Sequence, residues 1–320
     1  MNRIIAFDYL RAMAIVGIIV CHFCYNFSET IWLGHWCGST FNALFLMMSG
    51  LLLGIAWNKK GRPAYGFVFL RHRFSRLSKV YYPFLVVMFA FCFAVGGYHI
   101  GIKDVVMHFL YLPWFDKLDG FGHLWFMTMI AICYLCIPVV SRLKIGWGGV
   151  NYIYIMLIIG SIILQNIVSQ NGLPGYLFVY LSMFLFMYLE APFIIEKCMK
   201  AEVLFFILML FFIVLSIGFF YFDLYSDHDL ISKWMGILSA MAVGYIILSV
   251  SKFFRENKIV RFCADFSFEI FLVHHVFAYG RFSVMNVAPS WYFGFLGLIF
   301  STIALGYGLR KISSLFLIKE

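Results

Sequence analysis

Residues 204–213 read LFFILMLFFI, an apolar run that has no polar face. A helix that is apolar all round lies either deep in a large protein or within a membrane. Similar runs recur along the chain, and several reach the roughly 20 residues needed to cross about 30 Å of hydrocarbon. They are continuous and lack the alternation of barrel strands, so the sequence predicts a bundle of membrane-spanning helices.

The overall composition also predicts membrane embedding. Hydrophobic residues make up 63% of the 320 residues and charged residues only 12%, whereas a typical soluble chain is about 25% charged. The net charge of +9 does not indicate a nucleic-acid partner, because the basic residues lie in short segments between apolar runs. In such segments, the distribution of basic residues indicates how the chain is oriented across the membrane. We expect a single membrane-embedded domain over residues 1–320.

We predict ten membrane segments in an all-α polytopic bundle with both termini in the cytoplasm. The segments cover residues 5–27, 41–57, 79–98, 123–140, 150–169, 176–194, 203–222, 232–250, 267–283 and 291–309. Of the 24 Lys and Arg residues, Arg11 lies within a segment, and the loops of one side hold only Lys103, Lys117, Lys233 and Arg281. The other side carries all the rest, and the positive-inside rule makes it cytoplasmic.

The first segment carries ionisable residues that the membrane interior disfavours. It reads FDYLRAMAIVGIIVCHFCYNF over residues 7–27. Arg11 and His22 are eleven positions apart, which on a helix puts them on one face, about 20° apart in direction and roughly 16 Å apart along the axis. Asp8 lies one turn before Arg11 and can pair with it. The alternative is an arginine that reaches toward the interface and a histidine satisfied by a neighbouring helix.

A basic loop is predicted before the third span, on the cytoplasmic side. It reads LRHRFSRLSKVYYP over residues 70–83 and contains Arg71, Arg73 and Arg76. The guanidinium fork suits phosphate oxygens, so one interpretation is a grip on a phosphorylated cofactor. Anchoring of the chain to anionic lipid is the other.

The fourth predicted span opens with GHLWFMTMIAICYL, residues 122–135. His123 and Trp125 lie at its outer end, where aromatic residues commonly anchor a helix at the membrane interface. In the sixth segment, Glu190 is a further charged residue, which we interpret as structural.

A short late span contains three ionisable groups. It reads FSFEIFLVHHVF over residues 266–277 and holds Glu269, His274 and His275. Packing alone does not explain three such residues in one apolar segment, so they are candidates for a functional site.

Two cysteine pairs, Cys21 with Cys24 and Cys133 with Cys136, have the C-x-x-C spacing of redox and metal sites. Both pairs lie in apolar segments, where a buried cysteine acts as a small hydrophobic residue. We therefore predict neither a disulfide framework nor a metal site.

At five places the chain resembles acyltransferase family three, the bacterial membrane O-acyltransferases. The matching stretches are DYLRAMAIVGIIVCH, MMSGLLLG, FLRHRFSRLSKVYYP, HLWFM and SFEIFLVHH, and they follow one another in the family's order. The first has the family's arginine and histidine separated by ten residues. Two departures stand out: the proline after the basic segment comes late, at Pro83, and no glutamate follows HLWFM.

The resemblance implies transfer of an acyl group, usually acetyl, from cytoplasmic acyl-CoA to a sugar hydroxyl of a surface glycan or its lipid-linked precursor. It also implies a multi-pass protein of the bacterial plasma (inner) membrane with about ten helices. The acceptor and the acyl group stay open, with polysaccharide, lipopolysaccharide, peptidoglycan and small metabolites as acceptors and acetyl- or succinyl-CoA as donor.

The resemblance and the residue pattern together suggest roles for these side chains. His22 acts as general base or as transient acyl carrier. The other residues expected to take part in catalysis are Arg11, Asp8, Glu269 and His274. The residues expected to bind CoA are Arg11, Arg71, Arg73 and Arg76, and those expected to bind the acceptor are His123 and Trp125.

A transporter or flippase for a glycan or lipid intermediate is the competing class, because it also needs charges within the membrane. The ordered motifs and the lack of clear inverted repeats favour the enzyme. Acyl-CoA, the acceptor and membrane lipid are the expected partners, and association of identical copies is left open.

Overall fold

The structure is a computed structural model that describes residues 5–60, 66–95, 100–115, 118, 120–146, 159–160, 163–164, 167, 176–200, 202–224, 229–279 and 282–315. Over these ranges the regular structure is helical and contains no strand, which confirms the predicted all-α class. Seven of the described helices are long and apolar enough to cross a membrane, or eight if one bent pair counts as a single span. The chain is therefore a polytopic membrane protein.

Two of the ten predicted segments are not among these helices. The segment at 150–169 lies for the most part outside the described residues. The segment predicted at 267–283 is helical only over the 12 residues of α12 (Ser267–Ala278). At 1.5 Å per residue, a helix of this length covers about 18 Å, which is less than the hydrocarbon thickness.

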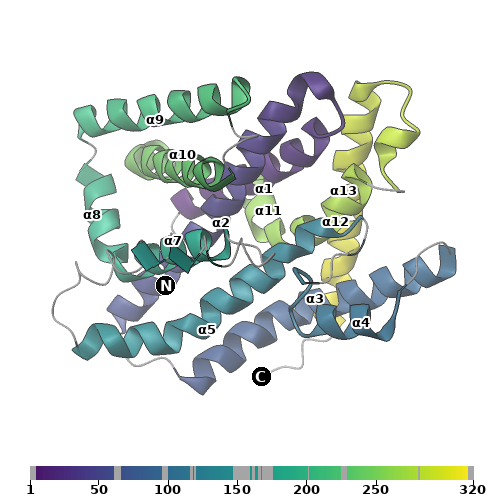
Figure 1. The fold of residues 1–320 in the computed structure, drawn as a ribbon, viewed down its shortest axis with the longest axis horizontal. Coiled ribbons are helices and arrows are strands. Elements are labelled where there is room, and N and C mark those ends of the chain that lie inside the picture. Colours follow the sequence, from purple (N-terminus) through teal and green to yellow (C-terminus); the bar gives the residue numbers. More distant parts are fainter. Residues whose placement is uncertain are drawn as a thin grey trace. The chain divides into compact units, whose positions relative to one another are not determined.

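The contacts divide the chain into two compact units, whose helices are labelled in Figure 1. Unit 1 comprises Met1–Tyr65 and Leu135–Ala264, and unit 2 comprises Gly66–Tyr134 and Asp265–Glu320. Unit 1 contains α1 (Ile5–Cys24), α2 (Ile31–Lys59), α7 (Tyr176–Leu189), α8 (Ala191–Lys200), α9 (Val203–Tyr221) and α10 (Asp229–Ser249). Unit 2 contains α3 (Phe67–Val95), α4 (Ile102–Phe109), α12 and α13 (Trp291–Leu315). Helices α5 (Trp125–Gly146) and α11 (Lys258–Asp265) each contribute to both, and single 3-10 turns lie at Ser28–Thr30, Gly122–Leu124, Ser251–Phe253 and Val284–Asn286.

Helix α2 is central to unit 1 and packs against α1, α7, α8, α9 and α10. It begins ten residues before the predicted start at 41, because its first turns pack closely on α1 through two glycines. A methyl group on Gly34 would lie 2.8 Å from the Tyr25 ring, and one on Gly38 would lie 2.8 Å from the Cys21 sulfur. Small residues four apart allow such close helix packing in membranes.

A second glycine pair lies at the other end of α2 and faces α7. Methyl groups on Gly50 and Gly54 would overlap the carbonyl oxygens of Phe184 and Tyr188. Here the two backbones themselves are in contact, so no side chain larger than hydrogen fits without moving a helix.

The segment predicted at 176–194 is not one straight helix. It breaks at Glu190, and α8 leaves α7 at an angle of 75°; Figure 1 shows α8 leading from α7 toward α9. Pro192 has no backbone N–H to continue the ladder of α7 but fits the first turn of a new helix, which explains the break. The structural interpretation of Glu190 agrees with its place at this bend.

The predicted basic loop at 70–83 is helical and belongs to α3, which begins at Phe67 and has Pro83 inside it. The prediction of a loop was wrong because hydropathy marks only the lipid-facing part of a helix. Arg, Lys and Leu are good helix formers, and no Gly or Pro lies between Phe67 and Pro83. The basic residues therefore have fixed positions on the first turns of α3.

Candidate active site

One candidate site lies on α1, in unit 1. The helix is unbroken from Ile5 to Cys24, so Arg11 and His22 lie on one face as predicted. Both side chains are half-buried, while Asp8 is buried. The proposed Asp8–Arg11 pair stays a prediction.

His22 contacts Tyr25, which in turn contacts His35, and neither Tyr25 nor His35 had a role assigned from the sequence. Its ring packs edge-on against the Tyr25 ring, with 5.8 Å between the centroids. The Tyr25 hydroxyl lies 3.4 Å from Nδ1 of His35 on α2, and the Asn26 side chain donates to the His22 carbonyl oxygen at 3.0 Å. Two histidines thus flank one tyrosine, which the glycines at 34 and 38 hold between α1 and α2. The polar character of the GHWCG stretch in an otherwise apolar helix was the signal available for His35.

A separate candidate site is a cluster of three buried histidines in unit 2. His123 stacks on His275 with 4.6 Å between ring centroids and lies edge-on to His274 at 5.4 Å. The three side chains are at most 7% exposed. The structure thus brings His123 together with His274 and His275, which the sequence placed in a different segment.

The hydrogen bonds of this cluster fix the tautomer of each histidine. Nε2 of His123 lies 3.0 Å from the Leu272 carbonyl oxygen. Nδ1 of His274 lies 2.7 Å from the Phe271 carbonyl oxygen, and Nδ1 of His275 lies 2.7 Å from that of Gly120. A carbonyl oxygen only accepts, so each of these nitrogens is the one that carries hydrogen. In the neutral rings, the other nitrogen of each histidine therefore carries a lone pair that can accept a proton.

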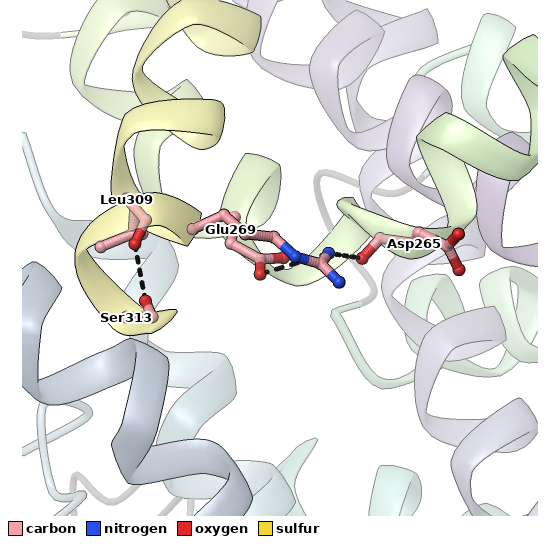
Figure 2. A network of polar contacts seen from close by, with 5 residues as sticks. Asp265, Glu269, Leu309 and Ser313 are labelled. Atoms are coloured by element: carbon pink, nitrogen blue, oxygen red, sulfur yellow. Dashed lines mark hydrogen bonds and ion pairs between the residues drawn. The ribbon is translucent and has the colours of Figure 1, made fainter. Parts of the chain in front are cut away.

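Glu269 does not join the histidines but forms an ion pair with Arg310 of α13. The closest carboxylate and guanidinium atoms are 3.5 Å apart, with the glutamate side chain 8% exposed and the arginine 44%. Arg310 also donates to the Asp265 carbonyl oxygen and lies over the Phe266 ring at 4.5 Å. Figure 2 shows the ion pair with Glu269 and the hydrogen bond to Asp265, together with the Ser313 hydroxyl donating to the Leu309 carbonyl oxygen. Arg310 was not predicted as a site residue, because from the sequence we assigned it to the cytoplasmic Lys and Arg residues that indicate orientation.

Trp125 is the first residue of α5 and follows His123 by two positions. Its ring packs edge-on against Trp114 at 5.3 Å, and the Trp114 backbone N–H donates to the Thr128 hydroxyl at 3.2 Å. Trp125 is therefore part of an aromatic contact at the start of α5, and its expected role in substrate binding stays a prediction.

The three arginines of α3 differ in their surroundings. Arg71 and Arg76 are exposed, whereas Arg73 is half-buried. The Arg73 guanidinium lies over the rings of Phe69 and Tyr134, at 5.5 and 5.9 Å from their centroids. Cation–π contact of this kind holds the side chain against the protein. Arg71 and Arg76 are the two that present their forks outward.

A groove of about 420 Å³ runs along α3 from Ser75 to Val87, and none of the three arginines is among its lining residues. At one end it is lined by Ser75, Ser78 and Lys79, and further along by Val86 and Val87. The thirteen residues from Ser75 to Val87 correspond to about 18 Å of helix. The walls of the groove are mostly apolar, although serine and lysine side chains contribute at the Ser75 end.

Among the described residues, no group of three or more His, Cys, Asp and Glu side chains could hold a metal ion. All eight cysteines are free thiols, and most are buried.

The fold and these side chains define a polytopic membrane protein with titratable groups inside its apolar segments. The family model for the acyltransferase domain matches residues 4–310, so the chain belongs to acyltransferase family three and is a membrane acyltransferase. No curated protein and no solved structure matches the chain.

Proposed function

We propose that this acyltransferase moves an acyl group, most simply acetyl, from cytoplasmic acyl-CoA to a hydroxyl of a cell-surface glycan or its lipid-linked precursor in the bacterial plasma membrane. The observation that carries the proposal is the unbroken α1, which holds Arg11 and His22 on one face. A basic imidazole near the outer end of a membrane helix suits removal of a hydroxyl proton near neutral pH.

In this proposal His22 is the general base. It takes the proton from the acceptor hydroxyl as the oxygen attacks the thioester carbonyl carbon. A new C–O ester bond forms, the C–S bond breaks, and the CoA sulfur leaves with the proton that the imidazole returns. Transient acylation of the His22 ring is the alternative path. Arg11 lies about 16 Å away along the axis and acts on the donor rather than on His22.

The donor would be held by the residues of α3. Arg71 and Arg76 are exposed and suit the phosphates of CoA. The groove from Ser75 to Val87 extends about 18 Å along α3 and has mostly apolar walls, which suits an extended arm that carries the thioester at its tip. Arg73, held by two aromatic rings, supports the segment rather than the phosphates.

The histidine cluster of unit 2 is proposed to hold the acceptor. Three imidazole rings packed together suit a sugar acceptor, because ring nitrogens form hydrogen bonds with hydroxyl groups. The match of residues 4–310 to the acyltransferase family favours the enzyme over a transporter.

Transfer of label from radioactive acetyl-CoA into glycan tests the proposal, in membranes that contain wild type, His22→Ala, Arg11→Ala or Val16→Ala. Val16 is half exposed on the same helix and serves as the matched control. We expect His22→Ala to lower the rate by about 10²–10⁴-fold and Val16→Ala to leave it unchanged. Full transfer by a folded His22→Ala protein would rule out the assigned base. Label on the wild-type protein without acceptor would favour the acyl-carrier path.

A further inference from the structure

Unit 1 contains a cavity of about 400 Å³ that the acyl-transfer chemistry does not use. Helices α1, α2, α7, α8, α9 and α10 all contribute to its walls, which are almost entirely apolar. Five methionines, Met47, Met48, Met187, Met209 and Met241, line it. Methionine side chains are flexible and adapt to ligands of irregular or variable shape. Neither Arg11 nor His22 is among the lining residues.

The length of the cavity matches one leaflet of a bilayer. Along α9 its walls extend from Glu202 to Phe212, and along α10 from Leu248 to Leu238. Ten residues of helix correspond to about 15 Å, which is half of the roughly 30 Å of hydrocarbon. Water does not fill an apolar space of this kind, whereas an apolar ligand does.

Charge lies at one end of this space. Lys197 of α8 and Glu202, just before α9, are its charged wall residues, and both are exposed. The Lys197 ammonium lies 5.7 Å above the Phe193 ring, while the adjacent Lys200 is already paired with Glu196 at 2.7 Å. This end belongs to the side that the distribution of basic residues assigns to the cytoplasm.

Helix α8 has the geometry of an interfacial helix. It leaves α7 at 75°, so with α7 crossing the membrane it runs close to the membrane plane. It turns Phe193, Ile194 and Cys198 to the cavity. A chain that enters past α8 would leave its head group beside Lys197 and Glu202.

We propose that this cavity binds one hydrocarbon chain of an amine-bearing zwitterionic phospholipid of the inner leaflet. Lys197 binds the lipid phosphate, and Glu202 binds the head-group amine. A hydrocarbon chain gains little on moving from the bilayer into an apolar protein cavity, because lipid tails are as apolar as its walls. Retention and selection of the lipid therefore depend on the two charged residues.

The test uses the full chain purified in mild detergent, with bound lipid measured by native mass spectrometry. Added phosphatidylethanolamine, phosphatidylglycerol and free fatty acid serve as the three probes. We expect about one phosphatidylethanolamine per wild-type chain and weaker binding of the other two. Lys197→Gln should weaken phospholipid binding on the order of tenfold, as the loss of one charge-assisted contact implies. Glu202→Gln should remove the preference for the amine head group.

A filling substitution tests the cavity itself. A side-chain carbon on Gly244 would lie 3.7 Å from Leu44, an ordinary contact, so Gly244→Leu should occupy the space and abolish lipid retention. Gly218→Leu on α9 is the matched control, because nothing lies within 4 Å of that position. Equal retention by both variants would overturn the site. Equal binding of the three probes by wild type would overturn the head-group assignment. If Gly244→Leu fails to fold, the variants at the exposed residues Lys197 and Glu202 still test the head-group contacts.

Discussion

Removing the positive charge of Arg310 should destabilise unit 2 through the buried carboxylate that it leaves behind. Glu269 is 8% exposed, and its partner is 44% exposed at 3.5 Å. Loss of one member of a fully buried pair costs about 3–5 kcal/mol, and exposed pairs contribute about 0.2–1 kcal/mol. With one partner half in solvent, we expect Arg310→Gln to cost about 2 kcal/mol.

A double-mutant cycle isolates the pair from the other contacts of Arg310. Polar couplings in membrane proteins reach about 1.7 kcal/mol. If Glu269→Gln alone costs about 1 kcal/mol, the double variant should cost about 2 kcal/mol rather than the additive 3, since the second substitution removes a charge that is already unpaired. The free energies come from reversible unfolding in mixed micelles titrated with denaturing detergent.

The control for this cycle is Lys311→Gln, which removes a neighbouring charge from the same helix; the Lys311 ammonium lies over the Tyr307 ring at 5.0 Å. It should change stability by less than about 0.5 kcal/mol. Additivity of Arg310→Gln and Glu269→Gln within about 0.5 kcal/mol would refute the ion pair. Acyl transfer per folded molecule that is lost in Glu269→Gln but kept in Arg310→Gln would return Glu269 to a direct role in the reaction.

Two other substitutions test the packing. Gly54→Ala should lower the melting temperature, because overlap with a backbone oxygen of α7 costs about 1–3 kcal/mol, more than the roughly 1 kcal/mol by which alanine stabilises a helix relative to glycine. The control Gly218→Ala, in open space, should raise the melting temperature. Equal shifts in the two variants would contradict the close approach of α2 and α7. His275→Leu should speed hydrogen exchange at residues 120–124, because it removes the donor to the Gly120 carbonyl oxygen. His275→Asn should keep a donor there and therefore keep the exchange slow. Equal exchange rates in the two variants would refute the role of this hydrogen bond.

The parts of the fold that depend on local pattern could be predicted from the sequence. Apolar runs mark helices directly, because hydrocarbon leaves the backbone no other partner than itself. The shared face of Arg11 and His22 follows from helix periodicity alone. The break after Glu190 also had a local signal in Pro192, although an apolar composition on both sides of it suggested one continuous span.

The partners of the candidate site residues could not be predicted in this way. His123 and His275 are 152 positions apart, and nothing in either segment specifies the other. Arg310 lies at the end of a span, where a cation serves orientation and pairing equally well. The helical start of α3 was missed for a different reason: a helix that extends into water loses its hydropathy signal while keeping its backbone hydrogen bonds.

The two glycine pairs of α2 have a mechanical consequence. Gly34 and Gly50 are sixteen residues apart, which places the pairs about 160° apart in direction and about 24 Å apart along the axis. One pair faces α1 and the other faces α7. A rod that is held from opposite sides near its two ends resists tilting in one sense, because that tilt presses it into α1 at one end and into the backbone of α7 at the other. During a catalytic cycle, a tilt of α2 should therefore occur only in the opposite sense, away from both close contacts.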